Sequence, residues 1–295
     1  MHRLRLVLLA ALLTGCPIAS DDDDAANDDD AANDDDAADD DDAADDDDAA
    51  DDDDAANDDD AADDDDAAND DDAADDEDSA IALREEQGEL ACTNSAGRTG
   101  AYYLPERTGP VPVALLFHAT GGDGAGILSG FIDAARAGGF ALVAPDSRFS
   151  PAGDATWEVG TEPLEVTPDL TFAQTCLDEV LDRADVELGD RLIAAGHSGG
   201  ASSAPYLASN DGRFTHFAVL HGGVFLNGLG PERPAGWLST GQDDEARPPQ
   251  ELSQYEAGLQ GAGFDATLHL YPGGHSVSAL EQTEMLAWWM APAGG

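Results

Sequence analysis

A serine flanked by glycines is the clearest chemical signal in this 295-residue chain. Residues 196–200 read Gly-His-Ser-Gly-Gly and follow an apolar stretch at residues 191–195. In the Gly-x-Ser-x-Gly pattern the serine occupies a strained turn between a strand and a helix, and the small neighbours let backbone segments pass closely. We therefore predict that Ser198 projects its hydroxyl above a sheet and acts as a nucleophile.

A serine hydroxyl needs a base to be nucleophilic at neutral pH, and a histidine held by a carboxylate usually supplies it. After a serine of this pattern, the acid and then the histidine follow along the chain. Of the seven histidines, only His269 and His275 follow both Ser198 and a plausible acid along the chain. His269 lies within a predicted strand, whereas His275 follows Tyr-Pro-Gly-Gly in a loop, so we predict that His275 is the base.

The acid should follow the strand that precedes the last one. There the sequence reads Gly-Gln-Asp-Asp-Glu at residues 241–245. A glycine at the end of the strand with the acid three positions later selects Asp244. Asp243 remains the first alternative and Glu245 the second.

An oxyanion formed on attack requires about two preorganised N–H donors. The amide of Gly199, directly after the nucleophile, is one candidate. The glycine-rich loop at residues 118–122 follows an apolar run and offers the second, which we assign to Thr120 with Gly121 as the alternative. This loop lacks the lysine of a phosphate-binding loop and the spacing of a dinucleotide site.

Alternating strands and helices would position these residues. The predicted strands are residues 111–117, 141–144, 191–195, 217–220, 237–240 and 266–271, and the predicted helices are residues 126–137, 169–184, 200–207, 249–262 and 277–290. Such alternation predicts an α/β fold with a mostly parallel central sheet and helices on both faces. Residues 89–93 and 100–104 are expected to form an antiparallel lead-in, and the irregular stretch 147–168 is expected to overhang the site.

The first 16 residues have a basic start, a short apolar run and a small-residue exit, which is typical of an export signal. The apolar run is too short to cross a bilayer core of about 30 Å as a helix. Leu-Thr-Gly-Cys at residues 13–16 resembles the lipobox of bacterial lipoproteins, which implies lipidation at Cys16. The alternative is a secretory signal cleaved near Ala19.

Residues 17–78 consist mainly of a repeated hexad of aspartate, asparagine and alanine. A stretch with so little apolar volume and so many like charges cannot bury a core, so we predict a disordered tether. A calcium-binding array is the alternative, but such arrays place glycine at the turns between acidic ligands, and this tract contains none. Residues 79–295 then form a single catalytic domain.

Charge and cysteine content narrow the function further. The net charge is −52, the chain contains no lysine, and 36 of its 64 acidic residues lie at residues 21–78. Nucleic-acid binding requires basic patches, so we predict no such partner. With Cys16 lipidated, Cys92 and Cys176 remain either as a disulfide or as two buried thiols, and neither has a neighbour at zinc-ligand spacing.

Several further motifs resemble the phospholipase/carboxylesterase-like and poly(hydroxybutyrate) depolymerase-like esterases over residues 112–289. Besides the serine motif, they are Pro145-Asp146-Ser147-Arg148, Trp157, Asp169-Leu170-Thr171-Phe172, Phe214-Thr215-His216 and Pro272-Gly273-Gly274-His275. The resemblance implies the α/β-hydrolase fold, cleavage of carboxylic esters without a cofactor or metal, and a triad of Ser198, Asp244 and His275. Two departures are Ala119, where these families usually have glycine, and Pro248, one residue later than usual.

The sequence thus predicts an exported, lipid-anchored esterase of the bacterial cell envelope, acting as a monomer on a small or polymeric ester. Two alternatives remain open. One is a peptidase or amidase on the same fold, and the other is a surface binding protein without catalytic activity.

Overall fold

The computed structural model describes residues 82–93, 97–150, 153–183 and 188–292. The predicted export signal, the lipidation site at Cys16 and the acidic tether lie outside the described residues. Within the described part of the chain, no helix is both long enough and apolar enough to cross a membrane.

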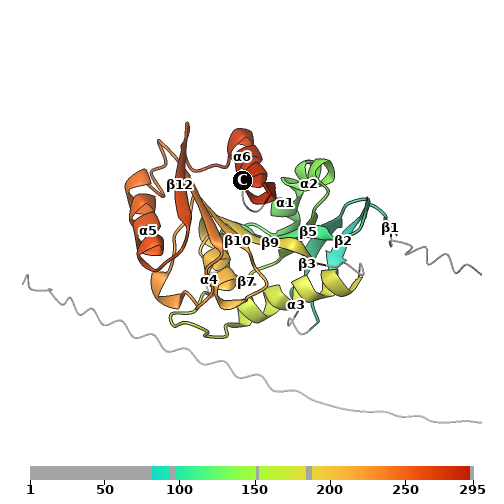
Figure 1. The fold of residues 1–295 in the computed structure, drawn as a ribbon. Coiled ribbons are helices and arrows are strands. Elements are labelled where there is room, and N and C mark those ends of the chain that lie inside the picture. The colour runs from blue at the N-terminus through green and yellow to red at the C-terminus, as the bar shows by residue number, and fades with distance from the viewer. Residues whose placement is uncertain (1–81, 94–96, 151–152, 184–187, 293–295) are drawn as a thin grey trace, which may run out of the picture. The chain divides into compact units, whose positions relative to one another are not determined.

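An eight-stranded sheet forms the centre of the structure (Figure 1). Its strands are β2 (Glu86–Leu90), β3 (Gly100–Leu104), β5 (Val111–Phe117), β6 (Ala141–Pro145), β9 (Leu188–His197), β10 (His216–Leu220), β11 (Ala235–Gly241) and β12 (Ala266–Tyr271). Their order is β12-β11-β10-β9-β5-β6-β3-β2. All neighbours from β12 to β6 are parallel, whereas β3 is antiparallel to both β6 and β2. The predicted mostly parallel sheet is therefore confirmed.

Helices cover both faces of this sheet (Figure 1). They are α1 (Gly124–Ser129), α2 (Ile132–Gly138), α3 (Pro168–Arg183), α4 (Ser203–Asn210), α5 (Pro249–Gly261) and α6 (Ala279–Met290). Buried side chains of α1, α2 and α6 belong to one apolar cluster, and those of α3, α4 and α5 belong to the other. The sheet is thus buried on both sides, which is why its central strands are continuous apolar runs.

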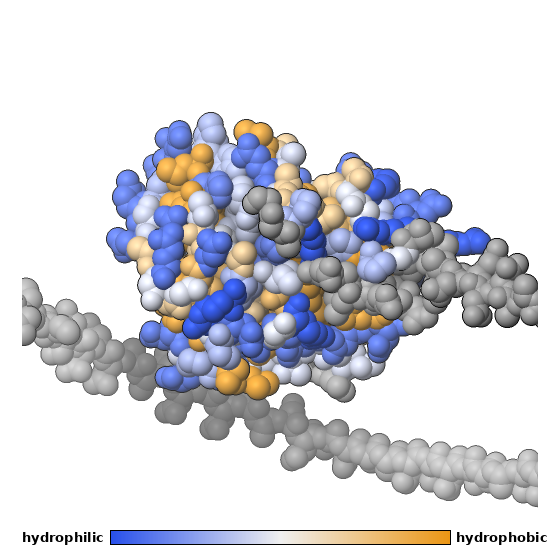
Figure 2. All heavy atoms as spheres, in the orientation of Figure 1, coloured by the Kyte–Doolittle hydropathy of each residue, from blue (hydrophilic) through white to orange (hydrophobic). Residues whose placement is uncertain are grey.

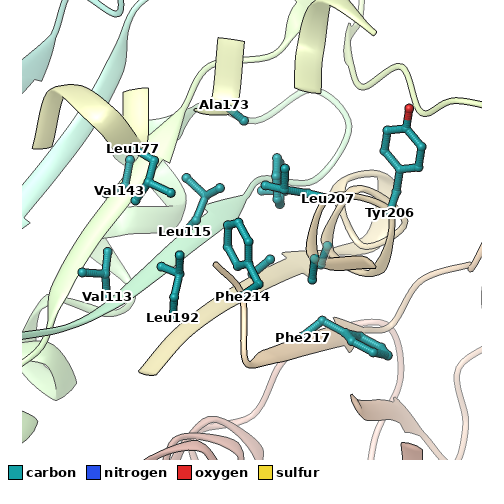
Figure 3. Packing of buried hydrophobic residues seen from close by; sticks show 14 of the residues in the cluster. Val113, Leu115, Val143, Ala173, Leu177, Leu192, Tyr206, Leu207, Phe214 and Phe217 are labelled. Atoms are coloured by element: carbon teal, nitrogen blue, oxygen red, sulfur yellow. The ribbon is translucent and has the colours of Figure 1, made fainter. Parts of the chain in front are cut away.

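Strand β5 shows how alternate residues divide between the two clusters. Val113 and Leu115 belong to the cluster under α3 and α4, whereas Ala114 and Leu116 belong to the opposite cluster. Successive side chains of a strand point to opposite faces, so this run serves both cores. Figure 3 shows Leu115 near Leu177 of α3, and Val113 near Leu192 of β9.

The helix predicted at residues 126–137 is wrong as a single element, because the chain breaks it into α1 and α2. Gly130 is the C-cap of α1, and its amide returns to Ile127 O. Gln282 Nε2 of α6 donates to Gly130 O at 2.8 Å, so a tertiary contact stabilises the break. The helix predicted at 200–207 also begins later, because the 3-10 turn η1 (Ser198–Gly200) precedes α4.

The antiparallel lead-in is present as β2 and β3, although β2 begins and ends three residues earlier than the predicted range 89–93. A separate small pair is formed by β1 (Ala82–Leu83) and β4 (Arg107–Thr108). The stretch 147–168, expected to be irregular, contains a short hairpin of β7 (Arg148–Phe149) and β8 (Ala155–Thr156). This hairpin contacts the loop after β5, since Gly121 N donates to Ala155 O at 3.0 Å.

Cys92 and Cys176 are joined in a disulfide across 84 residues of sequence. The bond links the segment after β2 to helix α3. In the chain-entropy model, closing a loop of this length stabilises a fold by about 4.6 kcal/mol.

We predict that the domain loses stability at mildly acidic pH, because half-buried histidines bind protons less readily in the native state than in the unfolded chain. Burial is the main cause that lowers the pKa of His197 and of His216 to about 4. As the pH is lowered, these histidines therefore bind protons near pH 6.5 in the unfolded chain but only near pH 4 in the native state. The free energy of unfolding should fall as the pH decreases across that window. The raised pKa of His221 contributes fully below about pH 6.5, so it does not affect the slope there.

The measurement is urea unfolding at several pH values across this window. The His216→Gln variant, which removes one of the histidines whose pKa is lowered by burial, should show a distinctly shallower dependence on pH than the wild type. Identical slopes for variant and wild type would contradict the prediction.

Candidate active site

Ser198 stands at the carboxyl end of β9, in the turn that leads to α4. Its φ of 51° lies in the left-handed region, which is strained for a residue with a side chain. The flanking glycines are required by packing. A Cβ on Gly196 would lie 2.3 Å from Gly200 O, and one on Gly200 would lie 2.4 Å from His118 O. The close backbone approach anticipated from the sequence motif is therefore present.

The structure brings Ser198, His275 and Asp244 together from three separate loops. The Oγ of Ser198 is 2.8 Å from Nε2 of His275. The Nδ1 of His275 is 2.9 Å from Oδ2 of Asp244 and 3.1 Å from Oδ1. These distances are ordinary hydrogen-bond lengths, so the three side chains form one continuous relay.

Asp244 is the buried member of the acidic triplet, whereas Asp243 and Glu245 are exposed. Burial by itself would raise the pKa of the Asp244 carboxyl. Hydrogen bonds from His221, from the Arg247 amide and from His275 outweigh burial, so the pKa lies well below its usual range. Asp244 therefore stays ionised at neutral pH, as a partner of an imidazolium must.

The loop after β5 lies against the serine turn. A Cβ on Gly199 would lie 3.0 Å from the amide nitrogen of Thr120 and 2.1 Å from its Oγ1. Among the described residues, Thr120 N has no hydrogen-bond acceptor, whereas the amide of Gly121 is engaged with Ala155 O. This difference favours Thr120 over Gly121 as an oxyanion donor. Ala119 does not have a positive φ, so the departure from the family pattern causes no strain.

His118 and Trp157, whose roles the sequence did not reveal, hold this loop in place by hydrogen bonds. The Ser147 amide donates to Nε2 of His118 at 3.0 Å, so the ring proton lies on Nδ1, which donates to Ala119 O at 2.8 Å. Trp157 Nε1 donates to His118 O at 2.9 Å. The stretch 147–168 therefore holds the predicted oxyanion loop by direct hydrogen bonds.

Two more residues missed by the sequence reasoning lie behind Asp244. His221 follows the end of β10, and its Nδ1 is 2.9 Å from Asp244 Oδ2. Its Nε2 is 3.2 Å from Oε2 of Glu281 in α6. The position of His221 at the carboxyl end of a parallel strand was an available signal, because ligands and active sites of open α/β sheets lie at that edge.

Among the described residues, His221, Asp244 and His275 form a group that could hold a metal ion, with ligand atoms within 4.8 Å of one another. Hydrogen bonds within the group already engage these nitrogen and carboxylate atoms. Hydrogen bonding among its own side chains thus accounts for the cluster.

A cavity of about 420 Å³ lies beside the site, between α1 and α6. His197 and Ser276, the sequence neighbours of Ser198 and His275, contribute to its lining. The apolar part of the lining includes Ile127, Phe131, Leu220 and Val277. The cavity therefore offers an apolar space next to the serine and its histidine.

On the face shown in Figure 2, apolar residues form separate areas among hydrophilic ones. The large apolar side chains that are exposed in the described residues are Phe149, Leu164, Val166, Phe225, Leu226, Leu270 and Leu280. Single exposed apolar residues are normal on a protein surface.

No family model matches the chain, and no curated protein matches its sequence. Among solved structures, the acetyl xylan esterase from Aspergillus awamori has a TM-score of 0.56 at 14% identity, covering 70% of this chain and 100% of that one. S-formylglutathione hydrolase from Staphylococcus aureus has a TM-score of 0.55 at 14% identity, covering 71% and 100%. The fluorophosphonate-binding serine hydrolase F of Staphylococcus aureus has a TM-score of 0.55 at 13% identity, covering 70% and 99%. With this sheet, these helices and these structural neighbours, the chain has the α/β-hydrolase fold.

Proposed function

We propose that this protein is a serine esterase that cleaves carboxylic esters through an acyl-enzyme on Ser198. The observation that carries the proposal is the hydrogen-bonded relay from Ser198 Oγ through His275 to Asp244. The structural neighbours support it, because two of them are described as an acetyl xylan esterase and an S-formylglutathione hydrolase.

In the first half of the reaction, Ser198 Oγ attacks the ester carbonyl carbon while its proton passes to His275 Nε2. The carbonyl oxygen becomes an oxyanion that accepts hydrogen bonds from the amides of Thr120 and Gly199. The imidazolium of His275, stabilised by Asp244, then gives its proton to the leaving alcohol oxygen. An ester between the acyl group and Ser198 remains.

In the second half, a water molecule loses a proton to His275 and attacks the acyl carbon. The bond to Ser198 Oγ breaks, and Oγ recovers the proton from His275, so the free acid and the original enzyme result. We place the apolar part of the substrate in the cavity between α1 and α6, because the lining of this cavity includes the sequence neighbours of Ser198 and His275.

The proposal is tested with matched 4-nitrophenyl esters and 4-nitroanilides of increasing acyl length. We expect a burst of nitrophenol equal to the enzyme concentration, followed by steady turnover, with the anilides cleaved at least about 100-fold more slowly because their leaving group must be protonated earlier. Equal rates for both series would favour an amidase. Binding of esters without burst or turnover would favour a binding protein.

We also propose that the enzyme is exported and anchored in the bacterial envelope by a lipid on Cys16. The lipobox-like sequence supports lipidation, and the Cys92 to Cys176 disulfide supports an oxidising compartment, where such bonds persist. The full chain expressed in a bacterium should incorporate labelled palmitate, and the Cys16→Ser variant should not. Absence of label from the wild type would contradict lipidation.

A further inference from the structure

The imidazole ring of His221 lies between two buried carboxylates, that of the proposed catalytic acid Asp244 and that of Glu281. His221 Nδ1 is 2.9 Å from Asp244 Oδ2, and His221 Nε2 is 3.2 Å from Glu281 Oε2. The exposed fraction of the side chain is 1% for His221 and 0% for both carboxylates. Burying two carboxylates is costly unless each is paired and hydrogen-bonded, so this arrangement calls for a charge that offsets them.

The fold fixes both ends of this arrangement. The amide of His221 continues the β10 to β11 ladder by donating to Ser239 O at 2.8 Å, although its φ is 51°. Glu281 is held by the start of α6, because its carboxylate accepts from Ser278 N while its own amide donates to Ser278 Oγ, each at 3.2 Å. A negative charge is favoured in the first turn of a helix. Since Ser278 lies only three residues after His275, the same capping interaction also anchors the loop that carries the base.

The proton count follows from the chemistry of these groups. An ionised carboxylate has no proton to donate, so it can only accept hydrogen bonds. If Asp244 and Glu281 are both ionised, then His221 must donate from both ring nitrogens, which makes it an imidazolium. We propose that His221 and Glu281 form a buried ion pair that positions Asp244 for the reaction, with His221 permanently charged.

The surroundings of His221 agree with this charge assignment. The titratable groups that face it are Asp244 after β11, Glu281 of α6, His197 of β9 and His275 after β12. Burial tends to lower the pKa of His221, but its hydrogen bonds to Glu281 and Asp244 outweigh burial and raise it. Burial likewise tends to raise the pKa of Glu281, and the bond to His221 leads the effects that lower it. Burial lowers the pKa of His197 to about 4, so His197 is neutral at pH 7 and does not compete for the carboxylates.

The catalytic consequence concerns one oxygen atom. Oδ2 of Asp244 accepts from His221 Nδ1 and from His275 Nδ1, both at 2.9 Å. The oxygen that orients the base is therefore itself held by His221, and the charge of His221 is balanced by Glu281. His221 and Glu281 act through Asp244 and are positioning residues. This part of the inference rests on the proposed esterase function, whereas the protonation state of His221 does not.

The decisive variant is Glu281→Gln in the full chain. Glutamine is as suitable as glutamate at the third position of a helix for the capping interaction, so the substitution removes the charge and retains the cap. Glu284→Gln is the matched control, because it removes the same charge from α6 at an exposed residue. The Glu284 carboxylate accepts a hydrogen bond from Tyr271 OH at 2.7 Å. His221→Gln identifies the His221 resonances among the seven histidines.

The readouts are the ¹⁵N shifts of histidine ring nitrogens from about pH 5 to about pH 9, together with kcat and KM for a 4-nitrophenyl ester. We expect both nitrogens of His221 to stay protonated throughout in the wild type and in Glu284→Gln. In Glu281→Gln, His221 should lose a proton within the range, and kcat should fall about 10- to 100-fold at the upper end with KM nearly unchanged.

Three outcomes would overturn the inference. They are an unprotonated ring nitrogen on His221 in the wild type at pH 7, a wild-type kcat in Glu281→Gln, and lowered thermal stability of Glu281→Gln with unchanged titration of His221. The last would make Glu281 a helix cap alone. Failure of the wild type to cleave any ester would refute the proposed function, and the nitrogen shifts would still report the ion pair separately.

Discussion

The Ser198→Ala variant is expected to lose fluorophosphonate labelling completely and to cleave esters about 10⁵- to 10⁶-fold more slowly than the wild type. The reason is that Ser198 Oγ, 2.8 Å from His275 Nε2, is the only side-chain atom in the proposed mechanism that forms a bond to the acyl carbon. Intact mass of the full chain after probe treatment reports the adduct, and steady-state kinetics report kcat.

Ser203→Ala is the matched control for this experiment. Ser203 lies close to the nucleophile in sequence, at the start of α4, and its buried Oγ has no hydrogen-bond partner among the described residues. Removing that hydroxyl should leave labelling and turnover within about twofold of the wild type. If Ser198→Ala still formed an adduct, the nucleophile would have to be another residue.

Asp244→Asn should reduce kcat about 10⁴-fold while KM changes little. An amide at this position can donate to Nδ1 of His275, which stabilises the tautomer with its proton on Nε2 and removes the base that Ser198 needs. The fall should persist across the pH range, because no change of pH restores a carboxylate at residue 244. Rates measured from acidic to alkaline pH provide the check.

Asp243→Asn is the control, since it makes the same substitution one residue earlier at an exposed position. We expect its kcat to remain within about twofold of the wild type. A larger loss in Asp243→Asn than in Asp244→Asn would reverse the assignment of the acid.

The candidate site was predicted from the sequence to different extents in its different parts. The serine turn and the loop histidine could be predicted from the sequence, because each is encoded by a few adjacent residues with a strong backbone requirement. For the acid, the spacing from Gly241 selected Asp244 and left Asp243 and Glu245 as alternatives, and in the structure Asp244 is buried and bonded to His275 whereas the other two are exposed. The local spacing therefore favoured one of three adjacent carboxylates, but burial and the hydrogen bond to His275 depend on the packed structure.

His221 and Glu281 could not be found by spacing, since 60 residues separate them. The capping pair of Ser278 and Glu281 was a readable signal for the start of α6, but it does not say what else the carboxylate contacts. The break between α1 and α2 was also missed. Gly130 lowers helix propensity only modestly, and Gln282, which donates a hydrogen bond to the free carbonyl oxygen of Gly130, lies 152 residues further along the chain.

The sequence by itself determined the alternation of strands and helices, the parallel sheet that follows from it, and the identity of the strained serine, because these depend on hydrophobic periodicity and on local backbone sterics. Only the tertiary structure decided that Asp244 is the carboxylate buried against His275, that the Thr120 amide has no hydrogen-bond acceptor among the described residues, and that a second histidine lies behind Asp244. Those outcomes depend on desolvation and on hydrogen bonds between distant segments, and such energies exist only once the segments are packed together.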